Sequence, residues 1–386
     1  MGHFGDFQHE IYADDGEGLP ISYDGLEQAA KAAMTPQSFA FVAGAAGTER
    51  TARANLSAFD RWRLVPRVLR DVSERDLSTT LFGTPMAAPV LLAPVGLNSI
   101  VHDDAESAPA AAAAALGLVH VVSTASTTPL EKIASAEPEG RRWFQLYWPR
   151  TDELAKSLVT RAERAGYQAI VLTVDTCAVS WRPRDLAYRN LPFHTGQGIG
   201  NYLTDPVFRA GLAEPPESSE DALRAAIGEW SRQFGNPTLT FADLARLKSW
   251  TSLPVVVKGI CHAEDARAVL DAGADGIIVS NHGGRQVDGA RAALDCLPDV
   301  VAAVSGRVPV LFDSGIRCGA DILVALALGA SAVLVGRHWV YGLGVGGRRG
   351  VEHAMRCLLA EFDLMLALSG YARPAQLDRT SVVRES

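Results

Sequence analysis

The amino-acid sequence predicts a (β/α)8 barrel, the TIM-barrel fold class, on three observations. Eight short apolar runs follow one another from about residue 86, helical patterns separate them, and polar residues gather where the runs end. The alternative is an open, doubly wound parallel sheet. The count of eight runs and the lack of a G-x-G-x-x-G motif after the first run favour the barrel.

The eight runs have the composition of buried parallel strands. They are continuous and rich in β-branched residues, as strands covered on both faces are. In chain order they span residues 88–96, 118–124, 142–148, 169–175, 253–259, 276–281, 308–315 and 332–337. Helical stretches between them end in Gly, a common helix C-terminus signal. A closing helix is predicted at 351–367.

Two segments lie outside this repeat. Residues 1–85 form an N-terminal extension with a helical pattern at 25–43, which is expected to cap one end of the barrel of residues 86–386. Residues 176–240 form a long insertion after the fourth run, rich in Pro, Gly, Glu and Ser. Such loops are usually functional or mobile, and this one is expected over the C-terminal face, where barrel enzymes have their active sites.

Composition disfavours several classes of protein. A net charge of -8 argues against a general nucleic-acid binder, which needs a positive surface. The five Cys are scattered, so neither a disulfide framework nor a metal site is predicted. No apolar tract reads as a membrane span, and the N-terminal residues lack the features of a signal peptide. We therefore expect a cytoplasmic protein without a nucleic-acid or membrane partner.

The carboxyl ends of the eight runs carry most of the chemically useful residues. Because parallel barrel strands end at the same face, these residues are expected to converge on one active site. In chain order they are Pro94, Val95, Gly96, Ser123, Thr124, Gln145, Tyr147, Thr173, Asp175, Lys258, Ser280, Asn281, His282, Arg285, Asp313, Ser314, Gly315, Arg317, Gly336 and Arg337.

The last two of these ends predict a phosphate site. DSGIRCGAD follows the seventh run and GR follows the eighth. Glycines let backbone N–H groups approach a phosphate, a helix N-terminus favours the anion, and Arg pairs with it. Tight turns alone are the alternative explanation. The pattern also does not separate a cofactor phosphate from a phosphorylated substrate.

The segment SNHGGRQVDG is the sharpest motif. His282 can take up a proton near neutral pH, the two following glycines leave room for a planar ligand, and Arg285 can bind a carboxylate. Lys258 closes the buried run PVVV, where it needs an anion or an electron-rich partner. A Schiff-base lysine, contact with a cofactor ring and an internal ion pair all remain open for it.

Together these motifs resemble the FMN-dependent 2-hydroxy acid oxidising enzymes. The resemblance covers nearly the whole chain, including AGAAGTERTARANLSAFDRWRLVPRVLRDV before the barrel, FQLYW and TVDT. Within that family, WRPRDL and NYLTDPVF in the long insertion look most like lactate 2-monooxygenase.

The resemblance implies a role for each site residue. His282 removes a proton from the substrate, and Asp175 stabilises the resulting imidazolium. Arg182 and Arg285 hold the substrate carboxylate, and Tyr147 hydrogen-bonds near the reacting carbon. The residues implied to bind FMN are Pro94, Val95, Gly96, Ser123, Gln145, Thr173, Lys258, Ser280, Asp313, Ser314, Gly315, Arg317, Gly336 and Arg337.

Three positions depart from common family patterns. Phe41 stands where many members have a substrate-binding Tyr, and the lost hydroxyl removes one hydrogen bond worth about 0.5–1.5 kcal/mol. Ala125 stands where glycolate oxidase has Trp, and Gly96 where many oxidases have Ala. Phe41 and Ala125 predict a more apolar and wider pocket, whereas Gly96 occurs both in the monooxygenase and in members that react poorly with O2.

The sequence thus predicts FMN-dependent oxidation of a small L-2-hydroxy acid with O2, foremost as a lactate 2-monooxygenase that forms acetate, CO2 and water. Alternatives are an oxidase that releases the 2-keto acid and H2O2, or a dehydrogenase with another acceptor, on larger or aromatic acids such as mandelate. A lyase or isomerase that forms a Schiff base at Lys258, and a non-catalytic barrel, belong to other classes. The resemblance also implies a homo-tetramer or octamer.

Overall fold

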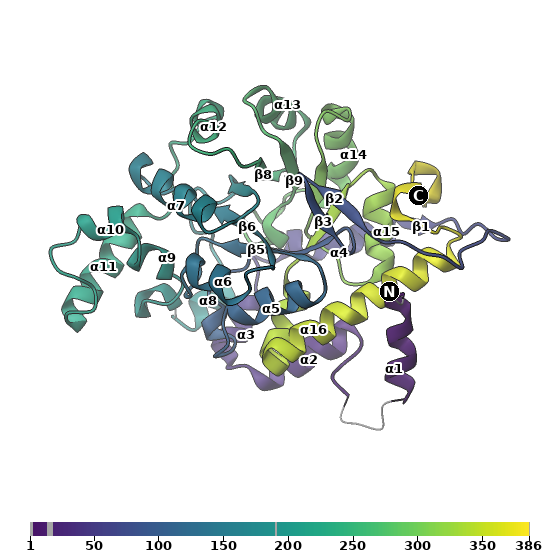
Figure 1. Ribbon diagram of the computed structural model, residues 1–386, viewed down its shortest axis with the longest axis horizontal. Helices are drawn as coiled ribbons and strands as arrows, with labels where there is room; N and C mark the ends of the chain where they lie inside the picture. The colour runs from purple at the N-terminus through teal and green to yellow at the C-terminus, as the bar shows by residue number, and fades with distance from the viewer. Residues whose placement is uncertain (1–2, 14–17, 190, 386) are drawn as a thin grey trace.

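A computed structural model describes residues 3–13, 18–189 and 191–385. Its centre is a closed barrel of eight parallel strands in the order β10-β11-β4-β5-β6-β7-β8-β9 (Figure 1). The TIM-barrel prediction is confirmed, because each predicted run contains one strand or most of one. The strands are β4 (Val90–Leu92), β5 (Val119–Ser123), β6 (Arg141–Leu146), β7 (Ile170–Thr173), β8 (Val255–Ile260), β9 (Gly276–Val279), β10 (Val310–Phe312) and β11 (Ala332–Val335).

Helices between the strands cover the outside of the barrel. Apolar residues such as Val119, Trp143 and Val256 fill its interior, while a second, larger core lies between strands and helices. The covering helices are α5 (Ser107–Ala115), α6 (Leu130–Ala136), α7 (Asp152–Arg164), α12 (Phe241–Lys248), α13 (Ala263–Asp271), α14 (Ala293–Val304), α15 (Gly319–Ala327) and α16 (Arg337–Leu368). The closing helix predicted at 351–367 is therefore the second part of α16, after non-helical residues at Gly346 and Gly347.

The segment before the barrel contains α1 (Phe7–Ala13), α2 (Tyr23–Ala33), α3 (Pro36–Ala43) and α4 (Arg50–Asp60). The single helical pattern predicted at 25–43 is two helices, because Thr35 caps α3 and Pro36 occupies its first turn. β1 (Trp62–Leu64) pairs with β12 (Val382–Arg384), so the C-terminal strand is tied to the segment that precedes the barrel. The hairpin of β2 (Thr79–Leu81) and β3 (Thr84–Met86) adds Leu81 and Met86 to the interior barrel core. A domain division at residue 85 stays a prediction.

The insertion 176–240 is folded and largely helical. It contains α8 (Pro183–Ala187), α9 (Gly200–Leu203), α10 (Pro206–Ala210) and α11 (Glu220–Gln233), and the last three lie together at one end of the molecule (Figure 1). Phe193 stacks on Trp230 with ring centroids 4.4 Å apart, and Trp230 contacts Phe234 at 5.1 Å. This aromatic cluster gives the insertion a core of its own. Among the described residues, no helix combines the length and apolar character that crossing a membrane requires.

Candidate active site

A cavity of about 610 Å³ opens at the carboxyl ends of the barrel strands. This volume lies within the roughly 300–1,000 Å³ typical of cofactor and small-molecule sites. The predicted site residues that line it are Phe41, Pro94, Val95, Gly96, Ser123, Tyr147, Arg182, Lys258, His282, Arg285, Asp313, Ser314, Gly315, Arg317, Gly336 and Arg337. The other predicted residues lie behind this wall: Gln145, Asp175 and Ser280 hydrogen-bond to residues that form it, and Thr173 hydrogen-bonds to Gln145. Thr124 and Asn281 do not line the cavity either, and they hydrogen-bond to the backbone of Tyr147 and Gly284.

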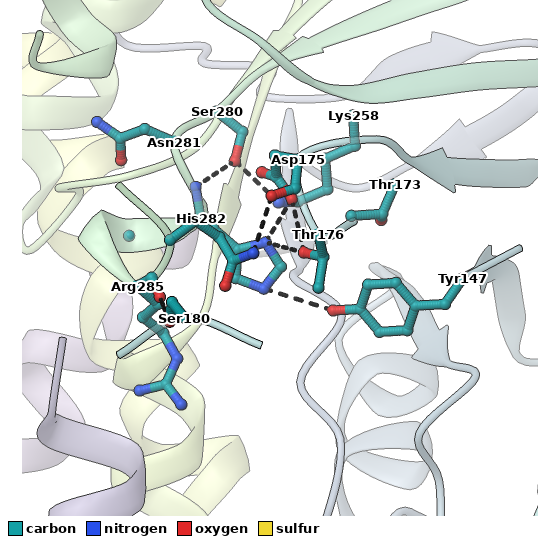
Figure 2. Close-up of polar contacts among 12 residues, drawn as sticks. Tyr147, Thr173, Asp175, Thr176, Ser180, Lys258, Ser280, Asn281, His282 and Arg285 are labelled. Carbon is teal, nitrogen blue, oxygen red and sulfur yellow. Dashed lines mark hydrogen bonds and ion pairs between the residues drawn. The ribbon is translucent and has the colours of Figure 1, made fainter. Parts of the chain in front are cut away.

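His282 and Asp175 form the centre of the site (Figure 2). Nδ1 of His282 lies 2.8 Å from Oδ1 of Asp175, and Nε2 lies 3.4 Å from the Tyr147 hydroxyl. Because a carboxylate only accepts hydrogen bonds, Nδ1 carries the proton and Nε2 is free to accept one. Thr176 also donates to Oδ1 of Asp175 at 2.9 Å. The imidazole is thereby oriented with its basic nitrogen toward Tyr147.

The surroundings shift the pKa values of both His282 and Asp175. Burial lowers the pKa of His282, and the positive charges of Lys258 and Arg182 act in the same direction, while Asp175 opposes them. For Asp175, burial alone would raise the pKa, but His282 and Lys258 outweigh it and lower the pKa to about 2. Asp175 is therefore a carboxylate and His282 a neutral base at neutral pH.

Lys258 is almost fully buried beside the cavity. Its Nζ donates to Oγ of Ser280 at 2.8 Å and lies 3.1 Å from Oδ2 of Asp313. Burial opposes the charge, yet Asp313 and Asp175 raise the pKa of Lys258 above its usual value. A charged ammonium is a poor nucleophile, so this geometry disfavours a Schiff base and favours contact with an electron-rich ring.

The arginines around the cavity are held mainly by neutral carbonyl groups. Arg285 donates through Nη1 to the carbonyls of Phe41 and Gly44, both at 2.7 Å. Arg337 donates to the carbonyls of Val42 at 3.0 Å and, like Arg285, of Gly44, at 2.9 Å. The C-terminal turn of α3 therefore positions both guanidiniums. Burial, followed by a neighbouring arginine, lowers the pKa of each.

This arrangement fits two anionic groups. The ion pairs that the described residues form at the cavity are Lys258–Asp313, His282–Asp175 and Arg182–Asp185. Within the described part of the chain, Arg285, Arg317 and Arg337 thus have no carboxylate partner at the cavity, and Nε of Arg317 is buried without a hydrogen bond. Buried charges need a counter-ion, so a phosphate and a substrate carboxylate would complete the site.

Close backbone packing and a chain of hydrogen bonds shape the part of the cavity wall around Gly96 and Ser123. A Cβ on Gly96 would lie 2.5 Å from the Ala125 carbonyl oxygen, so the backbone there approaches closely. Ser123 donates to Oε1 of Gln145 at 3.0 Å, and Nε2 of Gln145 donates to Thr173 at 3.1 Å. This chain of hydrogen bonds fixes Ser123 at the cavity surface and leaves the other two behind it.

Several cavity residues escaped the sequence analysis. Thr176 directly follows the predicted residue Asp175, and this position was the only sequence signal that could have indicated it. Val42, Leu97 and Val340 lie outside the insertion. Nine further residues belong to the insertion, whose irregular pattern predicts no partner for them. They are Val179, Ser180, Asp185, Leu186, Arg189, Leu191, Phe193, His194 and Phe234.

The cavity contains an imidazole–carboxylate pair and arginines without carboxylate partners among the described residues. This combination is typical of barrel enzymes that bind an acidic substrate beside a phosphate-bearing cofactor. The chain belongs to the FMN-dependent dehydrogenase family, whose sequence model matches residues 30–384. FMN is accordingly its cofactor, and the oxidation of 2-hydroxy acids is its chemistry.

Three comparisons show the extent of this similarity. The chain is 44% identical over 352 residues to an L-lactate oxidase of Lysinibacillus sphaericus, covering 91% of this chain and 90% of that protein. It is 39% identical to an FMN-dependent alpha-hydroxy acid dehydrogenase of Penicillium citrinum, covering 100% and 97%. A crystal structure of mandelate oxidase superimposes with a TM-score of 0.83 at 37% identity, covering 95% and 99%.

Proposed function

We propose that this protein oxidises a small L-2-hydroxy acid with O2 as the electron acceptor, and that its particular reaction is that of a lactate 2-monooxygenase. The observation that carries the proposal is the cavity wall supplied by the folded insertion 176–240. A 2-keto acid and H2O2 that form together behind this wall would react with each other before either leaves. Lactate and O2 then give acetate, CO2 and water.

The residues act on the substrate as follows. Two arginines, Arg182 and Arg285, bind its carboxylate, and Tyr147 hydrogen-bonds its hydroxyl group. Nε2 of His282 takes up a proton from the substrate, and Asp175 stabilises the imidazolium that results. Bound FMN supplies the two-electron acceptor for this oxidation.

These residues would hold the cofactor. Arg317 and Arg337, with the backbone of Gly315 and Gly336, would bind its phosphate, and Asp313 and Ser314 would contact its ribityl chain. Lys258, Ser280 and Ser123 would contact polar groups of its ring, and Gln145 and Thr173 support Ser123 from behind. The backbone of Pro94, Val95 and Gly96 would also contact the ring.

A second candidate is an oxidase that releases the 2-keto acid and H2O2, acting on larger or aromatic acids. Small Ala125 and apolar Phe41 favour it, as does Phe234, which packs edge-on to Tyr147 with ring centroids 5.5 Å apart. The relatives named L-lactate oxidase and mandelate oxidase support oxidase chemistry in general. An Ala125→Trp variant should then lose activity with mandelate while keeping it with lactate.

One product analysis separates the candidates. The purified holoenzyme is incubated in air with lactate, mandelate and longer 2-hydroxy acids, and the products are quantified. Acetate and CO2 from lactate support the monooxygenase, whereas pyruvate with equimolar H2O2 would identify an oxidase. Turnover with a dye but not with O2 would identify a dehydrogenase. Light scattering of the same sample tests the expected homo-tetramer or octamer.

A further inference from the structure

Asp185 is a carboxylate inside the cavity that the proposed mechanism does not use. It lies in the first turn of α8, in the insertion, and its side chain is only 12% exposed. Its Oδ1 is buried and has no hydrogen-bond partner among the described residues, although Asp185 lines the cavity. An unpartnered carboxylate oxygen costs free energy, so its presence requires an explanation.

The groups that face Asp185 are the two arginines assigned to the substrate. Oδ2 lies 3.9 Å from Nη1 of Arg182, and Arg285 exerts the larger charge effect on it. Burial raises the pKa of Asp185, and both arginines act against that rise. The distance to Nη1 exceeds that of a hydrogen bond. Asp185 is thus a loose counter-ion and does not clamp either guanidinium.

Both arginines keep N–H groups available for an incoming anion. Nε and Nη2 of Arg182 donate to Ser180 and Gln286, which leaves Nη1 without a hydrogen bond. Arg285 uses only Nη1, toward the α3 turn. A bound carboxylate would take the remaining N–H groups and would then lie near the carboxylate of Asp185.

We propose that Asp185 is a positioning residue that acts as a loose counter-ion to Arg182 and Arg285 in the substrate-free enzyme and repels the carboxylate of the 2-keto acid product. It thereby weakens product binding and limits how long the 2-keto acid stays beside H2O2. The effect on binding depends only on the two arginines. The effect on product identity rests on the proposed monooxygenase reaction.

Charge-removing variants test the first part. Asp185→Asn and Asp185→Ala should each bind pyruvate to the holoenzyme about threefold to tenfold more tightly, the size expected for one partly screened charge interaction. Pyruvamide, which has the same shape without the charge, should bind all forms alike. Asp185→Glu keeps the charge and should not tighten binding. Isothermal titration calorimetry with each probe gives these constants, and thermal melting shows whether each variant is folded.

A matched control is Glu217→Gln. Glu217 also pairs with an arginine of the insertion, Arg209 at 2.7 Å, but it is exposed and does not line the cavity. It should leave pyruvate binding unchanged. Weaker or unaltered pyruvate binding in both Asp185→Asn and Asp185→Ala would overturn the inference, because Asp185 would then orient the arginines and not compete for them.

Steady-state products test the second part. Asp185→Asn should lower KM for lactate, lower kcat if 2-keto acid release limits turnover, and raise the ratio of acetate to free H2O2. If wild type and variant both release only pyruvate and H2O2 while the variant binds pyruvate more tightly, the proposed monooxygenase fails and the role of Asp185 stands. An unchanged acetate ratio in an enzyme that does form acetate would overturn the retention part of the inference.

Discussion

At His282 the backbone as well as the side chain is specialised. Its φ of +60° lies in the left-handed region, and its N–H donates to Oγ of Ser280 at 3.0 Å. A non-glycine residue held there is strained, and such strain is commonly found at functional positions. Ser280 also accepts from Lys258, so one hydroxyl fixes the base and the buried cation together.

The first prediction concerns this base. His282→Gln keeps a polar side chain but removes the basic nitrogen, so kcat should fall about 10²- to 10⁴-fold, the usual contribution of general acid–base catalysis. FMN content should stay near that of wild type because His282 is not assigned to the cofactor. Steady-state oxygen consumption and flavin absorbance measure the two quantities. Turnover equal to wild type would exclude His282 as the base.

The second prediction concerns pH. A base must be deprotonated, so kcat/KM should rise with pH through the pKa of His282 and level off above it. Since burial lowers that pKa, the plateau should begin below neutral pH. Asp175 raises the pKa of His282, so Asp175→Asn should move this acidic limb to still lower pH and reduce the plateau. A limb that moves to higher pH in the variant would contradict this account.

The catalytic base, its carboxylate partner and the buried lysine were predictable from the sequence because each stands at or directly after the end of a buried strand. His282, Asp175 and Lys258 stand at the ends of runs that the barrel brings to one face. The shared anchor for Arg285 and Arg337 was not predictable, since it is the carbonyl of Gly44 and carries no side-chain signature. Asp185 was also missed, because its significance depends on two arginines located by tertiary structure.

At the scale of elements, the continuous apolar runs predicted the barrel strands more accurately than the polar patterns predicted the N-terminal segment and the insertion. A continuous apolar run must be buried on both faces, which a parallel barrel strand allows, so all eight strands appeared where they were predicted. The insertion 176–240 was harder to predict because its order comes from aromatic contacts between distant residues. Phe193 and Trp230 are one such pair.

The third prediction tests how the insertion is attached. Gly200 begins α9 and its N–H donates to the Ser126 carbonyl at 2.9 Å, while an added Cβ would lie only 2.0 Å from the Thr127 carbonyl oxygen. Gly200→Ala must displace backbone, so we expect about 1–3 kcal/mol of lost stability and a higher KM. Urea unfolding and steady-state kinetics measure these effects.

A second glycine of the insertion provides the control. Gly228 lies inside α11, and an added Cβ there meets nothing within 4 Å. Gly228→Ala should therefore stabilise the protein by about 0.5–1 kcal/mol through helix propensity and leave KM unchanged. Equal effects of the two substitutions would show that close backbone contact at Gly200 is unimportant.

At the scale of the whole molecule, the barrel buries polar groups on both sides of its strands. The active site lies at the carboxyl ends, but His120 on β5 points away from it and packs against Trp339 of α16, with ring centroids 5.9 Å apart. Burial, followed by the charge of Arg142, lowers the pKa of His120 to about 3. Burial likewise lowers the pKa of His338 to about 4.

These two imidazoles predict an early onset of acid destabilisation. Their folded pKa values lie below the unfolded value of about 6.5, so the unfolded chain takes up protons first as the pH falls. The stabilisation that they provide as neutral groups is complete above that value and declines as the pH drops toward 4 and 3. Between pH 8 and pH 5 each should reduce the free energy of unfolding by about 2 kcal/mol, before most carboxylates titrate.

The fourth prediction tests the contribution of His120 to this loss of stability at low pH. His120→Leu removes one of the two titrating groups, so the free energy of unfolding should change by about 2 kcal/mol less than in wild type between pH 8 and pH 5, whatever its absolute value. Urea unfolding with saturating FMN at several pH values measures this slope. The control is His9→Leu, which replaces an exposed imidazole of α1 and should retain the wild-type slope. If His120→Leu also retains that slope, the imidazole of His120 accepts a proton without unfolding, and the barrel must open locally around β5 to let it do so.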